Sequence, residues 1–446
     1  MRYPAHLAIL ACALIGVFHV SAQCRPSTGC ASEAFAAVDQ TMLDVMCDND
    51  IPGATLAVAY DGVIVYERGY GTSDIFRQQP MEPDALMRIA SVSKPLTVSA
   101  ARTLIDQGAF ELSDYAFDLG QPGGTGLLAV DPFPALGDPR LADITVLDLI
   151  RHRAGWNRDL VGDWIFSELL VARELGVAPP PGRQNTIDWI AGQPLQFTPG
   201  TDTVYSNIGC LVLGLIVEDF TGLPIDQAIQ QLVLDPIGVD DDDHAAGRTF
   251  EPDTDPREPW YHAPRLFVNV FDPTGPLVPS PYGAWDHEAL AGQGGQIATA
   301  SALARAAAHR GVNGSNIGRS KPPTLQGNWR WNHTGVLDGT GALIRQRGDG
   351  ITYAVLFNTR GFGGTIRNAL DPVFDQMLDG ATPFPTEPPS CCAADVNNDG
   401  LANPADFNAW VIAFNNQTPA CDQNLDSLCN PADFNAWVIN FNAGCG

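Results

Sequence analysis

The hydrophobic pattern of the central part of the chain predicts strands near its two ends and helices between them. An apolar run at 54–60 reaches a turn at Asp61-Gly62 and continues as a second strand-like run at 63–70, which is typical of a β-hairpin. Late strands are expected at 341–347 and 351–358. Helical patterns occur in the middle, at 92–107, 146–151 and 211–220. We therefore expect an α/β (α+β) fold: an antiparallel sheet flanked by helices, an inserted all-helical lobe, and a cleft between sheet and lobe.

The first residues have the pattern of an export signal. An apolar run from Leu7 to Phe18 is followed by small residues up to Ala22, which predicts a signal peptide over 1–22. The alternative, a membrane anchor, is disfavoured because the run has about a dozen apolar residues where a span requires roughly 20. We expect a protein outside the cytoplasm, secreted, periplasmic or on the cell surface, without a membrane span.

Composition narrows the functional classes. The chain has 446 residues, 45% of them apolar, which is enough for one large core and an accessory module. Its formal net charge of −26 argues against nucleic-acid partners, because binding to phosphates requires clustered Lys and Arg. Lysine is scarce, since Lys94 and Lys321 are the two in the chain. Each of them is therefore informative.

A proline-rich segment divides the chain. The sequence from 381 to 390 reads Ala-Thr-Pro-Phe-Pro-Thr-Glu-Pro-Pro-Ser, which suits a linker and neither a helix nor a central strand. No Lys or Arg follows Arg367, and the segment after the linker is dense in Asp and Asn. After the signal peptide we expect a main domain at 32–378, a linker at 379–390 and a second domain at 391–446.

The last part contains an internal repeat with the ligand spacing of calcium loops. The ten residues from Asn403 recur from Asn430. In each copy, oxygen-bearing side chains occupy positions 1, 3, 5 and 12 of such a loop, and a backbone carbonyl is available at position 7. The predicted ligands of the first loop are Asp395, Asn397, Asp399, Leu401 and Asp406. Those of the second loop are Asp422, Asn424, Asp426, Leu428 and Asp433.

This pair of loops resembles dockerin modules, which have two calcium loop-helix units. The resemblance implies an EF-hand-like module that binds Ca²⁺ and, through an apolar helix face, a cohesin-like or cell-surface protein partner. Gly400 suits the turn at position six of the first loop, whereas Ser427 stands there in the second, so we expect weaker binding at the second. The apolar face consists of Phe407, Trp410, Phe434 and Trp437. Alternatively, these aromatics are the module's own core and calcium only stiffens it.

Nine cysteines remain once Cys12 is removed with the signal peptide. Five of them lie at the end of the chain, at Cys391, Cys392, Cys421, Cys429 and Cys445. In an exported protein this density predicts disulfides, whose pairing the sequence leaves open. The odd number leaves one thiol free or intermolecular, and we expect Cys210 to be a small buried apolar residue. No spacing suggests a zinc site.

The segment Ser91-Val-Ser-Lys94 opens the helical pattern at 92–107 and places Ser91 and Lys94 on one helix face. A serine hydroxyl is a weak nucleophile until a neighbour takes its proton, and a lysine can do so once burial favours its neutral form. Ser-x-x-Lys alone occurs by chance in many proteins. Here it uses one of two lysines, and Lys321 has no serine three residues before it.

Two further motifs follow in order. Tyr205-Ser-Asn207 precedes an apolar helix, and His333-Thr-Gly335 precedes a late strand. Together with Ser91 and Lys94, they resemble the penicillin-recognising serine hydrolases, which include penicillin-binding proteins, class C β-lactamases, DD-peptidases, D-aminopeptidases and related esterases. The resemblance covers nearly all of 32–378 and implies a β-lactamase/transpeptidase-like fold.

The resemblance also implies roles for the matching residues of the first two motifs. Ser91 is the acylated nucleophile, Lys94 accepts its proton, and Tyr205 protonates the leaving group as a general acid/base. Which of Lys94 and Tyr205 is the acylation base stays open. Asn207 orients Lys94 and the substrate amide. Neither a metal nor another cofactor is expected for catalysis.

The third motif shapes the other wall of the cleft. By resemblance, His333 and Thr334 meet a substrate carboxylate or carbonyl, and Gly335 lets the substrate backbone approach. The backbone amides of Ser91 and Val336 form the oxyanion hole. β-Lactamases of this group generally carry Lys-Thr-Gly here, whereas His-Thr-Gly is more similar to DD-peptidases, D-aminopeptidases and some esterases. We therefore expect weak β-lactamase activity at most.

The sequence thus predicts an acyl-enzyme serine hydrolase that cleaves an amide or ester bond in a small peptide or ester. The alternative is a catalytically silent surface protein whose cleft binds a ligand and whose calcium module docks it to a partner. Trp156 and Trp285 either line the cleft or are buried aromatics of the core.

Overall fold

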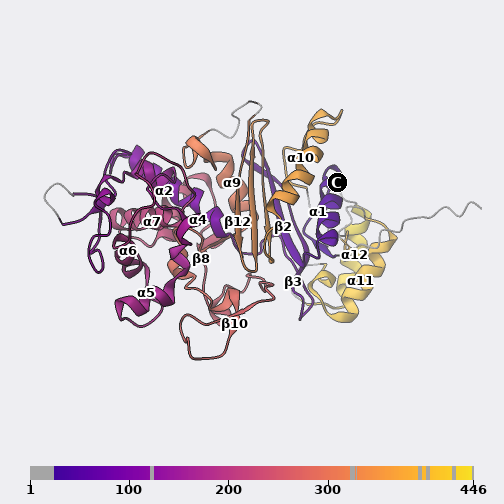
Figure 1. Ribbon diagram of the computed structural model, residues 1–446. Coiled ribbons are helices and arrows are strands. Elements are labelled where there is room, and N and C mark those ends of the chain that lie inside the picture. Colours follow the sequence, from indigo (N-terminus) through magenta and orange to yellow (C-terminus); the bar gives the residue numbers. More distant parts are fainter. Residues whose placement is uncertain are drawn as a thin grey trace, which may run out of the picture.

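In the computed structural model, which describes residues 25–120, 125–321, 327, 329–389, 394–397, 402–423 and 428–443, an antiparallel sheet lies between two layers of helices (Figure 1). Its strands follow the order β1 (Ser27–Thr28), β3 (Val63–Asp74), β2 (Gly53–Tyr60), β14 (Ile351–Phe357), β13 (Thr340–Arg347) and β12 (Arg330–Leu337), and β4 (Gln79–Pro80) pairs with β3. Because β2 pairs with β14, the two ends of the main domain meet in the middle of the sheet. The predicted antiparallel sheet is confirmed.

The predicted hairpin is β2 followed by β3. Its turn residues Asp61 and Gly62 have φ values of 47° and 88°, a left-handed pair that matches the twist of the flanking strands. Almost every residue of β2, β13 and β14 is buried, because helices cover the sheet on both faces. This explains why these strands appear as continuous apolar runs instead of alternating patterns.

Two helices cover one face of the sheet and a third covers the other (Figure 1). The first face carries α1 (Ala36–Asp48) and α10 (Gly363–Asp379), which also contact each other. The opposite face carries α9 (Ala300–His309). Between the sheet and the pair α1 and α10 lies a core that includes Phe35, Met42, Leu56, Phe357 and Phe374.

The helical lobe predicted between the strands is present. It contains α2 (Ser93–Asp106), α3 (Val146–Ile150), α4 (Arg158–Val161), α5 (Glu168–Leu175), α6 (Arg183–Ala191), α7 (Asn207–Thr221) and α8 (Ile225–Ile229). Helix α7 is its centre, with residues 207–217 all buried, and it packs against α2 and α3. In the described part of the chain no single helix has the length and hydropathy to cross a bilayer, and the one candidate pair, α7 with the segment to Ile237, is bent by 76°.

Short strand pairs complete the lobe and its border with the sheet. One is a three-stranded sheet in the order β5 (Met87–Arg88), β11 (Gln296–Ala298) and β8 (His244–Ala246). The others are the pair β9 (Leu266–Phe267) and β10 (Val278–Pro279), and the parallel pair β6 (Phe117–Asp118) and β7 (Leu128–Ala129). Strand β5 leads directly into the 3₁₀ turn η2 (Ala90–Val92) and α2. The sheet border and the lobe therefore meet at the Ser91 segment.

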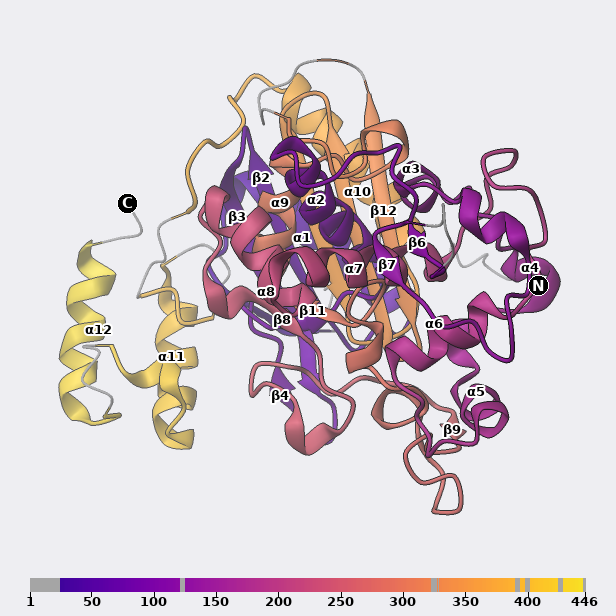
Figure 2. The same ribbon diagram turned by 90° about the vertical axis from the view of Figure 1, so that its left-hand side faces the viewer.

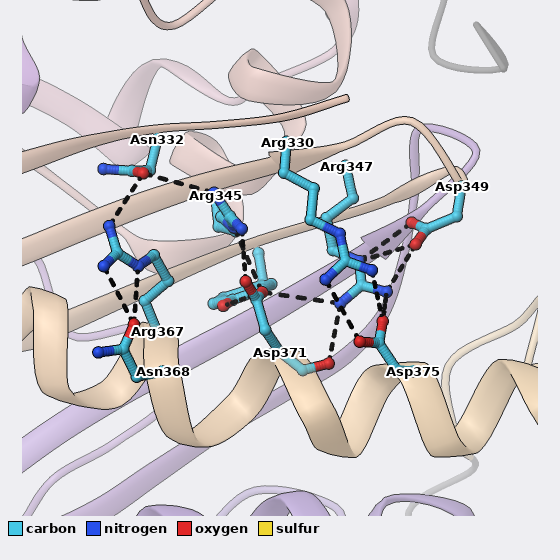
Figure 3. Close-up of polar contacts among 10 residues, drawn as sticks. Arg330, Asn332, Arg345, Arg347, Asp349, Arg367, Asn368, Asp371 and Asp375 are labelled. Carbon is cyan, nitrogen blue, oxygen red and sulfur yellow. Dashed lines mark hydrogen bonds and ion pairs between the residues drawn. The ribbon is translucent and has the colours of Figure 1, made fainter. Parts of the chain in front are cut away.

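An arginine–aspartate network, formed by Arg345, Arg347, Asp349, Asp371 and Asp375, fastens α10 to the sheet (Figure 3). Arg345 on β13 donates to both carboxylate oxygens of Asp371 on α10. Arg347, whose side chain has no solvent exposure, lies 2.6 Å from carboxylate oxygens of both Asp349 and Asp375. Each buried guanidinium is thus matched by carboxylates, as buried charges require.

The C-terminal part forms two helices, α11 (Pro404–Asn416) and α12 (Pro431–Ala443), which stand apart from the main body in Figure 2. Their aromatics contact one another across the pair, with ring centroids of Phe407 and Trp437 5.4 Å apart and those of Trp410 and Phe434 5.6 Å apart. Trp410 and Trp437 are each 6% exposed. The two tryptophans therefore form a small core between the helices, whereas Phe407 and Phe434 are 39% and 41% exposed. Whether this face also binds a partner stays a prediction.

Four of the five cysteines within the described residues are disulfide-bonded. Cys421 and Cys429 form a disulfide, and Cys30 and Cys47 are each disulfide-bonded. Cys210 on α7 is free and buried, as predicted. The predicted signal peptide, and Cys391, Cys392 and Cys445, lie outside the described residues.

Candidate active site

Ser91 and Lys94 lie at the start of the long helix α2, where the backbone changes direction sharply. Ala90, directly before Ser91, has a φ of 46°, a left-handed conformation that is strained for a residue with a Cβ. Its small side chain is 1% exposed and leaves room for this turn. The turn leaves Ser91 partly exposed in a cleft and brings Lys94 Nζ to 3.0 Å from Ser91 Oγ.

The surroundings of Lys94 are polar but contain no carboxylate at ion-pair distance among the described residues. Its side chain is 1% exposed, and the Gln293 carbonyl accepts a hydrogen bond from Nζ at 2.6 Å. Nζ also lies 5.0 Å from the ring centroid of Tyr205. A buried amine that faces a hydroxyl and a carbonyl, with no anion to hold its proton, is placed to exchange a proton with Ser91.

Tyr205 lies between two cations. Lys94 is on one side, and the Arg158 guanidinium is 4.7 Å from the ring centroid. Arg158 is itself held by Asp163 at 3.5 Å, and the same carboxylate accepts a hydrogen bond from Asn207 Nδ2 at 2.6 Å. Asn207 thus holds the Asp163 and Arg158 pair beside Tyr205. Its predicted role in orienting Lys94 and the substrate amide stays a prediction.

Two histidines stand near the Lys94 ammonium. Burial, with the charge of Lys94 next, lowers the pKa of His333 to about 3. The same two causes lower the pKa of His152 to about 4, and the Nδ1 atom of His152 accepts a hydrogen bond from the Ser206 amide. Both rings are therefore neutral at physiological pH. His333 in the third motif can donate or accept a hydrogen bond but adds no positive charge to the cleft.

The third motif lies on β12, the last strand of the sheet, which packs against η2. Thr334 and Val336 line the cleft together with His333. A Cβ at Gly335 would lie 2.1 Å from the Ile89 carbonyl oxygen. The backbone of Ile89, two residues before Ser91, thus occupies the space left by the missing side chain of Gly335. The sequence had instead predicted that the substrate backbone uses this space.

Residue Asn332 shows how β12 is fixed in place. Its side-chain oxygen lies within hydrogen-bond distance of Arg345 and Arg367, at 3.4 and 3.2 Å, which joins it to the arginine–aspartate network (Figure 3). Its carbonyl oxygen accepts a hydrogen bond from Asn313 Nδ2 at 3.0 Å. The strand that carries His333 is therefore held from behind by charged contacts.

The cleft has a volume of about 860 Å³. Its lining includes the motif residues Ser91, Tyr205, Asn207, His333 and Thr334, together with the apolar residues Phe166, Phe267, Trp285 and Leu290. Trp285 thus lines the cleft, whereas Trp156 is part of the hydrophobic core. All residues expected from the sequence to carry the chemistry surround one cleft, apart from Lys94 and Gly335, which lie directly behind its surface.

Several site residues were missed by sequence reasoning. Gln293, Arg158 and Asp163 lie in loops or short helices, and no sequence motif marks them as site residues. Of these, Gln293 contributes its backbone carbonyl, so its side-chain type gives no indication. His152 follows α3, and its position beside Tyr205, with ring centroids 4.8 Å apart, results from the packing of α3 against α7.

The predicted calcium loops can be assessed at their described ends. Asp406 is fully buried, and its two carboxylate oxygens accept the amides of Asn397 and Asn403 at 3.1 and 2.8 Å. Asp433 repeats this with the amides of Gln423 and Asn430, at 2.9 and 2.8 Å.

Each position-12 carboxylate is therefore turned back onto its own loop, where Asp406 also closes a capping box with Asn403 at the start of α11. Asp395, Asn397, Asp422 and Leu428 also lie within the described residues. Asp399, Leu401, Asn424 and Asp426 lie outside them.

Comparison with known proteins agrees with the geometry. A family model described as β-lactamase matches residues 36–372. Among curated proteins, the chain is similar to esterase EstB of Burkholderia gladioli, with 29% identity over 219 residues, which is 47% of this chain and 52% of the esterase. It is also similar to penicillin-binding protein 4* of Bacillus subtilis, with 24% identity over 45% of this chain and 40% of that protein. The chain thus spans about half the length of the curated relatives it matches.

Solved structures support the fold. The D-amino acid amidase from Ochrobactrum anthropi SV3 superposes with a TM-score of 0.54 at 17% identity, over 79% of this chain and 100% of the amidase. At this identity the likeness concerns the fold. Together with the family model, it confirms the fold and the resemblance inferred for the main domain from the three motifs, and it does not extend to the dockerin-like tail.

Proposed function

The chain belongs to the β-lactamase family of serine hydrolases, and from this premise we propose that it is an exported enzyme that forms an acyl-enzyme on Ser91. The observation that carries the proposal is the 3.0 Å contact between Ser91 Oγ and the buried Nζ of Lys94. The bond cleaved is an amide or ester, and the substrate is a small peptide or ester.

Acylation begins at Ser91. Its Oγ forms a bond to the substrate carbonyl carbon while its proton moves to Nζ of Lys94, which enters this step as the neutral amine and leaves it as the ammonium. We assign Lys94 as the acylation base because the two atoms are in hydrogen-bond contact. The carbonyl oxygen becomes negative and is met by the backbone amides of Ser91 and Val336 at the end of β12. Because Lys94 is fixed by the Gln293 carbonyl, little reorganisation is needed.

Release of the leaving group requires a second proton transfer. Tyr205 gives its phenolic proton to the leaving nitrogen or oxygen as the bond to carbon breaks, and Lys94 returns a proton to Tyr205. In deacylation, water takes the place of the leaving group and the proton path runs in reverse. The products are a carboxylic acid and free Ser91, and no cofactor takes part in this scheme.

The shape of the cleft supports an apolar acyl group. Phe166, Phe267 and Trp285 line the same cleft as Ser91, which suits an aromatic or aliphatic acyl chain. The similarity to an esterase and to a penicillin-binding protein is compatible with ester or peptide substrates. With His333 neutral, the cleft lacks the cation that Lys-Thr-Gly would supply, which supports weak activity on lactams.

The test is the Ser91→Ala variant. It should lose essentially all hydrolysis of p-nitrophenyl acetate, and a fluorophosphonate probe should label the native protein at Ser91 and leave the variant unlabelled. Mass spectrometry of the labelled peptide identifies the residue. A folded native protein whose Ser91 is inert to the probe would support the alternative, a silent binding protein.

We further propose that the C-terminal part is a dockerin-like module that binds Ca²⁺. The buried carboxylates of Asp406 and Asp433, each turned onto its loop, support this. Bound Ca²⁺ would supply a positive charge that draws the acidic loop together. The residues that would hold it are Asp395, Asn397, Asp399, Leu401 and Asp406 in the first loop, and Asp422, Asn424, Asp426, Leu428 and Asp433 in the second.

Calcium titration by calorimetry tests the module. We expect two binding events, of which Asp395→Ala removes the tighter and Asp422→Ala the weaker. A cohesin-like or cell-surface partner is proposed for the outer helix faces, because Ile412 and Ile439 occupy equivalent repeat positions and are 62% and 68% exposed. Absence of any calcium heat in the native protein would contradict the dockerin resemblance.

A further inference from the structure

Among the described residues, the charged side chains that line the cleft form two arginine–aspartate pairs. Arg360, in the loop after β14, lies 2.7 Å from Asp338. Arg158 lies 3.5 Å from Asp163, and its guanidinium is also 4.7 Å from the ring centroid of Tyr205. The second pair is therefore in contact with the residue that the proposed reaction uses as its acid.

The chain around α4 holds Arg158 in this place. Asn157 caps the helix, because its side-chain oxygen accepts the Asp159 amide at 3.0 Å. The helix ends at Gly162, whose φ of 82° is a conformation that favours glycine. The turn there brings Asp163 back beside Arg158. The guanidinium and its carboxylate thus come from the two ends of one short helix.

Stability alone does not explain why an arginine is held here. The side chain of Arg158 is 42% exposed, and an ion pair with so much exposure contributes little to folding. The Oδ2 atom of Asp163 makes its shorter contact with Nδ2 of Asn207, at 2.6 Å. Asp163 is therefore fixed from α7, and its carboxylate in turn keeps the always charged guanidinium near Tyr205.

The charge of Arg158 reaches the groups around Tyr205. Burial, then the charge of Lys94 and, as a smaller cause, the charge of Arg158 lower the pKa of His152 to about 4. The ring centroids of His152 and Tyr205 are 4.8 Å apart. A positive charge at this range also stabilises negative charge that develops on a neighbouring oxygen during a reaction.

We propose that Arg158 is a positioning residue for the acid step, whose guanidinium stabilises the negative charge that Tyr205 acquires as it protonates the leaving group. The inference rests on the proposed function, because that function assigns this proton transfer to Tyr205. The phenolic O–H bond breaks as the leaving atom takes the proton, and the phenolate then receives a proton from the Lys94 ammonium. Arg158 keeps its own protons throughout and forms no bond to the substrate.

The contribution of Arg158 should grow with the basicity of the leaving group. A p-nitrophenolate departs as a stable anion and needs no proton. An alkoxide or an amide anion is far more basic and has to be protonated as it departs. A cleft that keeps a second cation at its acid is therefore suited to alkyl esters and amides, in addition to activated aryl esters.

Two esters of phenylacetic acid, the ethyl and the p-nitrophenyl ester, test this role through kcat/KM, which reports acylation. Arg158→Gln should lower kcat/KM by about tenfold or more for the ethyl ester and by less than about threefold for the p-nitrophenyl ester. Arg158→Lys keeps a charge near Tyr205, so its ethyl-ester activity should lie between those of the native protein and Arg158→Gln. If Arg158→Gln lowers both esters by the same factor, or lowers neither, the inference is wrong.

Two other arginines provide matched controls. Arg360→Gln removes the other arginine of the cleft, and Arg77→Gln removes an arginine whose side chain is 70% exposed in the turn between β3 and β4. Each variant should change kcat/KM for the two esters by the same factor. A selective loss of ethyl-ester hydrolysis in either control would contradict the assignment to Arg158.

The Tyr205→Phe variant distinguishes failure of this inference from failure of the proposed function. It should itself slow the ethyl ester more than the p-nitrophenyl ester. In the Tyr205→Phe background, Arg158→Gln should cause no further selective loss, because Arg158 acts through the phenol. If Arg158→Gln is still selective there, the inference fails and the proposed function stands. If Tyr205→Phe slows both esters equally, the acid of the proposed function is wrong, and the inference fails with it.

Discussion

Lys94 and Arg347 are both cations with almost no solvent exposure, at 1% and 2%, yet the protein surrounds them differently. Arg347 lies behind the sheet within hydrogen-bond distance of the carboxylates of Asp349 and Asp375. Lys94 lies at the cleft with a carbonyl and a hydroxyl as its contacts. A guanidinium stays charged in any environment, and here carboxylates satisfy that charge, whereas an amine beside a hydroxyl is of a chemical type that can pass a proton to and from it. The first arrangement stabilises the fold, and the second suits proton transfer.

The strongest challenge to this comparison is removal of the Lys94 amine. Lys94→Met should lower kcat/KM for p-nitrophenyl esters by about 10⁴, which is the upper range for a general base. Because no carboxylate is left unpaired, the melting temperature should stay the same or rise. Lys321→Met, which removes the other lysine, is the control and should keep full activity. More than a tenth of native activity in Lys94→Met would contradict the assigned role.

The reverse result is expected at Asp371. This carboxylate accepts from Arg345 and from the Tyr353 hydroxyl, the latter at 2.9 Å, so Asp371→Asn leaves a buried guanidinium without its anion. Unfolding in urea should show a loss of about 3 kcal/mol, as for other broken buried pairs. At a temperature where the variant is folded, kcat should stay within about twofold. A stability loss as small as that of the exposed Arg77→Gln would show that the network contributes little.

Adding a carboxylate beside Lys94 should make its surroundings resemble those of Arg347, where an anion pairs with the buried charge. Gln293 is 2% exposed, lines the cleft and has a side chain without hydrogen-bond partners within the structure described. In Gln293→Glu the new carboxylate would favour the charged ammonium, so kcat/KM at pH 7 should fall by about tenfold and recover at higher pH. A Gln293→Met variant, without charge, should keep its native pH profile. Equal profiles for the two variants would contradict the electrostatic explanation.

The smallest effect concerns the histidines near Lys94. An unfolded histidine titrates near pH 6.5, whereas burial holds the pKa of His152 at about 4. Below pH 6.5 the unfolded chain therefore binds a proton that the folded protein does not, so His152 lowers stability as the pH falls from 6.5 to 4. Between pH 7 and pH 5, the melting temperature should drop by less in His152→Gln than in the native protein. If the melting temperature drops by the same amount in both proteins, another group is responsible for the pH dependence.

Much of the fold was predictable because its signals are local. The hairpin at Asp61-Gly62, the buried runs of β13 and β14 and the helix that follows Ser91 all depend on neighbouring residues. Helix α7 begins earlier than its apolar pattern predicts, at Asn207, because the start of that helix packs against α3 and is buried by tertiary contacts.

The site was predictable only in part, and for a physical reason. Ser91 and Lys94 meet through helix geometry, so spacing alone places them together. The contact of Lys94 with the Gln293 carbonyl joins residues that are 199 positions apart. Because the acceptor is a backbone atom, the type of residue at 293 does not indicate this contact. Likewise, Gly335 is explained by the Ile89 carbonyl on another element, whereas its motif suggested an approach by substrate.

The packing of η2 against β12 has a further consequence, for the tolerance of the third motif to substitution. The Cβ atoms of a strand point to the faces of its sheet, so a Cβ at Gly335 that would collide with the Ile89 carbonyl shows that the segment before Ser91 lies on a face of β12. A larger residue at Gly335 would therefore push β12 and the turn of the nucleophile apart. The first and third motifs are held together by this backbone contact, and a change in one displaces the other.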